Sequence, residues 1–431
     1  MKFNINITCC IVTNILLSLV SDVSFAQNTI EVTGIVIDAE SKERLSFCAI
    51  GVSNNSMGTI TNEKGYFRLV VPDSLAGADV NFSYLGYKAY QCKVNSLKKS
   101  KNRIELIPVS IPIGKVIVRP HTPEDIIRMA IRKIPDNYPN SPFVLDGFYK
   151  EVLKENDLYI QYLEAFLKTY NFPYNDTAST QVKLVQGRTR DDLSDIQFLR
   201  KEADKRYKKL QKRAERKGEE LDEKRAETVK VIFDSPHRIL GTEPIRSKFF
   251  PIDTTQFKKF DYMFEKDNVL GEHELYTISY NARRQIKHIL FSGKIYIDKE
   301  TFAIVQILSH ADFVMPAAAK PILAATGLSI TNMRFDIQHE YAKTENTWYL
   351  RKVIMEGSGD FRKRRTFDED DLSHFEIEHA FVSTRLQTKN ISPIPPEERI
   401  IPNKKIIQQL GDYDEAYWRK NNKIEYILDE Q

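Results

Sequence analysis

The chain contains little cysteine, and the spacing of its cysteines excludes the usual dithiol chemistry. Four cysteines occur in 431 residues, and Cys9 and Cys10 fall inside an N-terminal apolar stretch. No C-x-x-C spacing is present, so a redox site of that type is excluded. Cys48 alternates with the apolar Ile50 on an expected strand. It is therefore either a small core residue or, in an exported protein, one half of a disulfide with Cys92.

Several catalytic signatures are also missing from the sequence. It contains no Gly-x-Ser-x-Gly elbow, phosphate-binding loop, dinucleotide fingerprint or H-E-x-x-H pair. His121 and Glu124 match the H-x-x-E metal pair of zinc carboxypeptidases, but a catalytic zinc needs a third ligand and an open position. The same residues form a complete helix start, with Thr122 as the cap and Pro123 in the first turn. The sequence therefore favours a helix start over a zinc site.

Neither sign of charge is in large excess. The chain has 63 basic and 59 acidic residues, which leaves a net charge of +4. This balance gives no reason to expect nucleic acid as a partner. No cofactor is expected from the sequence. After the first 26 residues, no apolar run is long and uninterrupted enough to predict a transmembrane helix.

Residues 1–26 have the pattern of a cleavable secretory signal peptide. Lys2 precedes an apolar stretch over residues 9–20, which is shorter than the roughly 20 residues of a spanning helix. Ser24 and Ala26 supply small residues before a cut at Gln27. The pattern predicts export; an uncleaved anchor remains as the alternative.

Residues 28–107 predict a seven-stranded β-sandwich. Short runs of alternating apolar and polar residues are separated by turn residues every eight to twelve positions. Three motifs occur in order: G-x-V-x-D from Gly34, G-T-x-T-N-x-x-G-x-F from Gly58 and F-x-Y-x-G-Y from Phe82.

These motifs, in this order, resemble the carboxypeptidase regulatory-like domain, a sandwich of the transthyretin type. The resemblance implies an accessory module without catalytic residues, despite the peptidase in the family's name. Such domains precede peptidases, TonB-dependent receptors and other envelope proteins, and they serve folding, docking or partner contact. The resemblance therefore implies a non-enzymatic envelope protein of a Gram-negative bacterium, in the periplasm or on the periplasmic side of the outer membrane.

The rest of the chain predicts a second, α+β domain. Residues 108–122 form an expected extended linker because of their prolines. Residues 123–391 begin with an amphipathic helix and continue as antiparallel strands, and the stretch GKIYIDKETFAIVQI from Gly293 resembles a strand pair of lipoprotein-carrier-like half-barrels. A curved antiparallel sheet is expected there, followed by a Pro-rich spacer and a C-terminal helix over residues 392–431. The fold class is thus mainly β.

A charged helical insertion is expected over residues 191–230. Ile196, Ala203 and Leu210 fall seven positions apart and give a narrow apolar stripe on a helix, and bases outnumber acids between residues 201 and 217. The insertion is either a solvated helix lying on the sheet or a contact for acidic partners, such as the phosphates of an envelope glycolipid.

Residues 313–330 form an unusual apolar segment between two strands. Pro316, Pro321 and Gly327 interrupt it, so a continuous spanning helix is not expected. One interpretation is a short helix that plugs one end of the β domain. The other is a lid or lipid-contacting loop that presents six apolar residues to a ligand or a bilayer: Phe313, Val314, Met315, Ile322, Leu323 and Leu328.

One histidine and two carboxylates alternate on a predicted strand, and they are the candidates for a metal site. His374, Glu376 and Glu378 share one face, which could hold a metal ion or simply face solvent. The leading hypothesis remains a non-catalytic envelope protein that binds an apolar or amphipathic ligand, a lipid or glycolipid, or a protein, with peripheral membrane contact. Its alternatives are a structural docking module for an outer-membrane receptor or surface complex and, more remotely, a metallohydrolase.

Overall fold

The computed structural model describes residues 28–109, 120–198, 235–247, 250–316, 318–365, 369–402 and 404–421, apart from Asn54, Ser56 and Thr177, together with five positions between 208 and 216. The expected signal peptide and most of the expected linker lie outside the described residues, as does most of the charged insertion.

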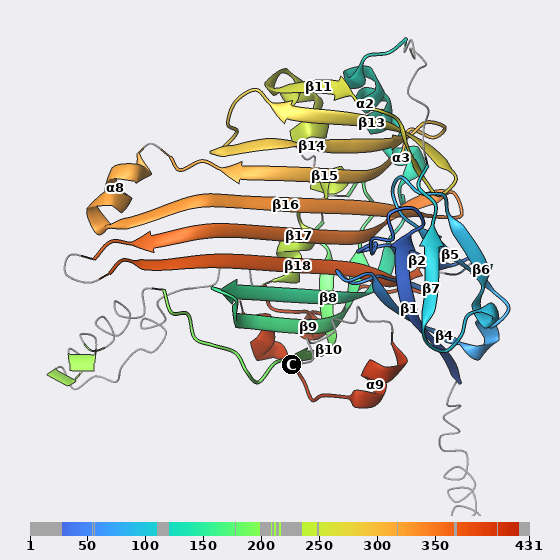
Figure 1. Cartoon of the computed structure of the whole chain (residues 1–431), viewed down its shortest axis with the longest axis horizontal. Helices are drawn as coiled ribbons and strands as arrows, with labels where there is room; N and C mark the ends of the chain where they lie inside the picture. The colour runs from blue at the N-terminus through green and yellow to red at the C-terminus, as the bar shows by residue number, and fades with distance from the viewer. Residues whose placement is uncertain are drawn as a thin grey trace, which may run out of the picture.

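Two small sheets form the N-terminal sandwich that the sequence predicts (Figure 1). One has the strand order β4-β1-β7 and the other β3-β2-β5-β6, and only the β1–β7 pair among them is parallel. Val36, Ile50, Leu69 and Phe82 are fully buried between the two sheets. The strands are β1 (Thr29–Asp38), β2 (Ala49–Val52), β3 (Gly58–Ile60), β4 (Tyr66–Pro72), β5 (Asp79–Ser83), β6 (Tyr90–Lys93) and β7 (Asn102–Leu106).

A large antiparallel sheet of 11 strands forms the second part of the molecule. Its order is β10-β9-β8-β18-β17-β16-β15-β14-β13-β11, with β12 paired to β13, and it is open at β10 and β11. The predicted mainly β fold, with a sandwich followed by an antiparallel sheet, is confirmed. The strands are β8 (Phe143–Glu155), β9 (Leu158–Asn171), β10 (Gln181–Thr189), β11 (Phe260–Phe264), β12 (Asn268–Leu270), β13 (His273–Ala282), β14 (Ile289–Asp298), β15 (Ile304–Phe313), β16 (Leu328–Thr344), β17 (Thr347–Lys363) and β18 (Asp371–Gln387).

Short helices lie around this sheet in the described part of the chain (Figure 1). The first begins as the sequence indicates, because Thr122 and Asp125 form a reciprocal capping box and Pro123 occupies the first turn. Its residues Ile126 and Ile127 pack into the core. The helices are α2 (Pro123–Arg132), α3 (Ile134–Asn137), α6 (Pro236–Leu240), α7 (Pro244–Ser247), α8 (Ala319–Thr326) and α9 (Glu415–Lys420), with 3-10 turns η1 (Asp73–Leu75), η2 (Val94–Ser96), η3 (Phe250–Ile252), η4 (Thr254–Lys259), η5 (Pro396–Glu398) and η6 (Ile406–Gln409).

The sandwich packs against one face of the sheet near one end of its strands (Figure 1). Ile60 of the sandwich joins Phe148, Phe166 and Val382 of the sheet in a buried cluster. At the opposite end, which we call the distal end, lie the described residues of three neighbouring connections: 283–288 between β13 and β14, 314–316 and 318–327 between β15 and β16, and 364–365 and 369–370 between β17 and β18. The long strands β16, β17 and β18 carry this end well beyond the sandwich.

Candidate functional site

The apolar segment that the sequence singles out lies at the distal end of the sheet. Phe313 ends β15, Leu328 begins β16, and α8 projects beyond the strands between them (Figure 1). Gly327 ends α8 with a left-handed φ of 71°, a conformation that favours glycine. The helix lies past the strand ends and does not fill the interior of the domain, so its placement agrees with a presented segment better than with a plug.

Most of the apolar side chains named from the sequence are only half-buried there. Phe313, Val314, Met315, Leu323 and Leu328 are all of intermediate exposure. Ile322 is placed in α8 by its backbone. Burial of such side chains against a lipid or another apolar surface would release roughly 25 cal/mol per Å² of area covered.

Hydrogen bonds tie the apolar segment to the connections on both sides of it. The amide of Val314 donates to the carbonyl of His288 at 2.8 Å, and the amide of Arg364 donates to the carbonyl of Gly327 at 2.8 Å. Lys363 also donates its ammonium group to the carbonyl of Thr326. Hydrogen bonds therefore join the described residues of the three distal connections to one another.

The two flanking connections differ in charge. On the β17–β18 side, Arg362 pairs with Asp370 and Arg365 pairs with Asp371, as the adjacent basic and acidic runs in the sequence suggest. On the β13–β14 side, residues 282–288 read ARRQIKH, and their basic side chains are exposed. Leu290, directly after this hairpin, is 39% exposed. The apolar segment is thus bordered on one side by a cationic hairpin.

The three metal-ligand candidates on β18 are not brought together as ligands. His374 Nδ1 lies 2.6 Å from Asp360 Oδ1, whereas Glu378 lies 2.6 Å from the ammonium group of Lys150. Glu376 is 3.8 Å from His374 Nε2. Within the described ranges, no group of three metal-ligating side chains has the geometry of a metal site.

A cleft of about 570 Å³ lies between the sandwich and the face of the sheet on which the sandwich packs. His310 lies in it between two carboxylates, with Nδ1 at 2.7 Å from Asp336 and Nε2 at 3.1 Å from Asp312. The hydrogen bond with Asp336 raises the pKa of His310, against the opposing effect of burial. Phe47 and Tyr84 line the sandwich side. The cleft therefore combines aromatic and charged groups from both parts of the chain.

Sequence reasoning did not single out the cationic hairpin or His310. The hairpin had a signal, since four of the seven letters of ARRQIKH are basic or histidine and the run lies between two predicted strands. The signal for His310 was weaker, because the alternation of His310 with Asp312 predicts only one of the two carboxylates that contact it. Asp336 lies on the next strand, and the register of β15 and β16 brings it opposite His310.

The two cysteines of the sandwich are free, and the structure does not form the disulfide that the sequence left open. Cys48 contacts the carbonyl of Ser83 through its sulfur, whereas Cys92 pairs with Val80 at the other end of β5. Three residues of a strand span about 10 Å, and a disulfide needs Cα atoms within about 7 Å. Cys48 is a small core residue, and burial raises the pKa of its thiol to about 12.

The fold and this surface define a mainly β protein in which a small sandwich is fixed to an open antiparallel sheet. Residues 32–118 match the family model of the CarboxypepD_reg-like domain. The N-terminal sandwich is therefore a carboxypeptidase regulatory-like domain, which is a regulatory type of domain and agrees with the resemblance in its sequence motifs.

The likeness of the chain to other known proteins is slight. No curated protein matches the chain. One solved structure, described as "Lipid-protein interactions in lipovitellin", is similar at 9% sequence identity and a TM-score of 0.22, covering 62% of this chain and 28% of that one. Among the helices in the described part of the chain, none is both long and apolar enough to cross a membrane.

Proposed function

We propose that this chain is a non-catalytic, exported protein of the cell envelope that binds an anionic lipid surface through the distal end of its sheet. The observation that carries the proposal is the hydrogen bond between Val314 and His288, which joins the apolar segment to the cationic hairpin. An apolar surface beside a basic one is the combination that peripheral proteins use at the interface of anionic membranes.

The two halves of this surface make separate contributions to lipid binding. The half-buried Phe313, Leu323 and Leu328 would enter the boundary between headgroups and acyl chains. Arg284 and Lys287 would lie at the level of the headgroups, where each basic side chain contributes about 1 kcal/mol next to an anionic leaflet. Binding is therefore expected to need both anionic lipid and intact apolar residues, and to weaken with salt.

Sedimentation with vesicles tests this proposal on the chain that begins at Gln27. Vesicles of phosphatidylcholine with and without phosphatidylglycerol are compared, for the unaltered chain and for Leu323→Asp combined with Leu328→Asp. We expect binding only to the anionic vesicles and a loss of at least about tenfold in the double variant, because two buried leucines are worth several kcal/mol.

A matched control is available at the opposite end of the molecule. Ile107 is 58% exposed in the sandwich, and Ile107→Asp also places a charge on an exposed apolar position. This variant is expected to bind vesicles like the unaltered chain, with thermal unfolding showing that all variants are folded. Equal binding by the double variant and the unaltered chain would overturn the proposal.

A second candidate function, docking of a partner protein, is favoured by the cleft beside His310. Its carboxylates Asp336 and Glu356 and its aromatic residues Phe47 and Tyr84 suit a basic segment of a partner that also carries an apolar side chain. A photoreactive residue at position 84 would test this idea. Cross-linked peptides of one partner rich in Lys or Arg would support it, and cross-links scattered over unrelated proteins would count against it.

The metallohydrolase alternative gains no support from the arrangement of the candidate ligands. His374 and Glu378 take different partners, Asp360 and Lys150, on different strands. Zinc analysis of the purified chain is the direct test, and a stoichiometric metal content would revive that alternative.

A further inference from the structure

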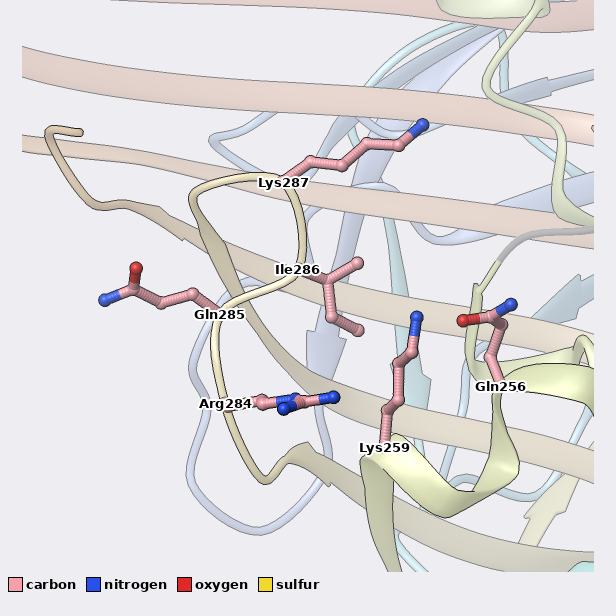
Figure 2. Close-up of a pocket in the computed structure, with 6 residues that line it drawn as sticks. All are labelled: Gln256, Lys259, Arg284, Gln285, Ile286 and Lys287. Carbon is pink, nitrogen blue, oxygen red and sulfur yellow. The ribbon is translucent and has the colours of Figure 1, made fainter. Parts of the chain in front are cut away.

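A hollow of about 560 Å³, lined mostly by basic and amide-bearing residues, lies between the cationic hairpin and η4. Figure 2 shows Lys259 and Gln256 on the η4 side, facing Arg284 and Ile286 of the hairpin, while Gln285 points away from them. No carboxylate is among the six residues that line it: Gln256, Lys259, Arg284, Gln285, Ile286 and Lys287.

Main-chain bonds fix the two walls of the hollow relative to each other. Ile286 and Ile289 exchange hydrogen bonds of 2.8 and 3.1 Å across a two-residue turn. Lys287 and His288 in that turn both have positive φ, at 52° and 68°, which is the geometry of a tight hairpin turn. The amide of Arg283 donates to the carbonyl of Lys259 at 2.8 Å and joins the hairpin to η4.

The charge of the hollow is not balanced from within. Arg283 pairs with Asp261 at 2.8 Å, so its guanidinium is neutralised outside the hollow. Lys259 and Arg284, by contrast, form no ion pair with any residue in the described part of the chain. Like charges held close together destabilise each other, and an anion placed between them removes that repulsion.

We infer that this hollow is a binding site for a phosphate group. A planar guanidinium binds phosphate through two parallel hydrogen bonds, and a lysine ammonium adds a mobile point charge. Arg284 and Lys259 supply these two groups from opposite walls.

Two kinds of molecule carry such a phosphate group: a soluble phosphate compound and a lipid headgroup. The headgroup source rests on the proposed function, because Val314 ties this hairpin to the apolar segment. Binding of a soluble phosphate ester does not depend on the proposed function.

The test is calorimetric titration of the chain from Gln27 with inorganic phosphate and with glycerol 1-phosphate at low ionic strength. The variants are Lys259→Gln combined with Arg284→Gln, and the matched control is Lys258→Gln. Lys258 is the exposed neighbour of Lys259 on η4 and does not line the hollow. We expect the double variant to weaken binding of glycerol 1-phosphate at least about tenfold and the control to change it less than about twofold.

Two results would overturn the inference. One is the absence of binding by either phosphate compound and by vesicles containing phosphatidic acid. The other is an equal loss in Lys258→Gln and in the double variant, which would mean a diffuse effect of charge. Binding of both soluble compounds with similar affinity supports a free phosphate, whereas binding of phosphatidic acid vesicles alone supports a headgroup.

The vesicle variants separate this inference from the proposed function. Leu323→Asp with Leu328→Asp leaves the hollow intact, so glycerol 1-phosphate is expected to bind that variant unchanged. If the unaltered chain ignores anionic vesicles but binds glycerol 1-phosphate, the proposed function fails and the phosphate site stands. If vesicle binding is lost in the leucine variant but retained in Lys259→Gln with Arg284→Gln, and no soluble phosphate binds, the site fails and the lipid surface stands.

Discussion

The ammonium group of Lys352 donates a hydrogen bond of 3.1 Å to the main-chain carbonyl of Phe47, and this bond links the middle of the sheet to the sandwich. Lys352 also forms an ion pair of 2.8 Å with Glu340, and its side chain is only 1% exposed. Phe47 itself has a positive φ of 57°, a conformation that is strained for a bulky residue. The contact with Lys352 helps to hold that conformation in place.

Removal of this buried cation is expected to destabilise the protein strongly. Lys352→Met leaves the carboxylate of Glu340 buried without its partner, which costs about 3–5 kcal/mol of unfolding free energy. The combination Lys352→Met with Glu340→Met removes both charges and is expected to recover a large part of that loss. Urea unfolding of the three proteins checks this expectation, and a double variant no more stable than the single one would contradict it.

Two buried histidines are expected to make the fold sensitive to mild acid. Burial lowers the pKa of His379 to about 4 and that of His339 to about 3, from an ordinary value of 6.5. Between pH 6.5 and the lowered pKa of each histidine, the unfolded chain binds protons that the folded chain does not. The free energy of unfolding therefore falls as the pH decreases below 6.5. The slope is up to about 1.4 kcal/mol per pH unit for each histidine.

Urea unfolding at pH 7, 6 and 5 measures this slope in the unaltered chain and in His379→Gln. The variant is expected to lose less stability on acidification, because one of the two groups no longer titrates. Carboxylates titrate in both proteins, so their effect cancels in the comparison. Identical slopes in the two proteins would show that His379 does not stay neutral in the folded state.

Gly293 is expected to tolerate no side chain. A Cβ atom at this position would lie 2.0 Å from the carbonyl oxygen of Leu308 and 2.7 Å from the hydroxyl of Tyr280. Gly293→Ala should therefore lower the unfolding free energy by roughly 1–3 kcal/mol or more through overpacking. Gly77→Ala is the matched control, since nothing lies within 4 Å of its added Cβ. Thermal unfolding that ranks the two variants equally would contradict the close approach of β14 and β15 at this glycine.

Thiol labelling is expected to find both sandwich cysteines reduced. In the chain from Gln27, mass spectrometry after unfolding without a reductant should detect two labelled thiols. In the folded protein, Cys92 should react first, because it is half-buried, whereas Cys48 is fully buried and its pKa is raised to about 12. No labelling of the unfolded chain would mean that the two residues form a disulfide in solution.

Local sequence patterns predicted helix starts and turns well, because these features depend on residues only a few positions apart. Thr122, Pro123 and Asp125 form the helix start that their spacing indicates. Asn156 and Asp157, residue types that favour turns, join β8 to β9, and both have positive φ. The apolar segment after Phe313 contains the short helix that its prolines and Gly327 allow.

The candidate surfaces could not be predicted in the same way, because their residues are distant in the sequence. Lys259 and Arg284 line the same hollow only because η4 and the β13–β14 hairpin lie side by side. His310 acquires Asp336 through the register of β15 and β16. His374 and Glu378 share a strand face, as their alternation predicts, but different neighbouring strands give them different partners.

The sequence by itself determined the sandwich, the strand character of the second domain and the apolar segment, because alternation, turn residues and capping act over a few positions. Tertiary structure decided where these elements meet. Strand order brought the cationic hairpin beside the apolar segment, and packing of the sandwich on the sheet buried Lys352 against Phe47 across 305 residues of sequence. Such contacts depend on which strands become neighbours, and that choice is made by burial of the whole core.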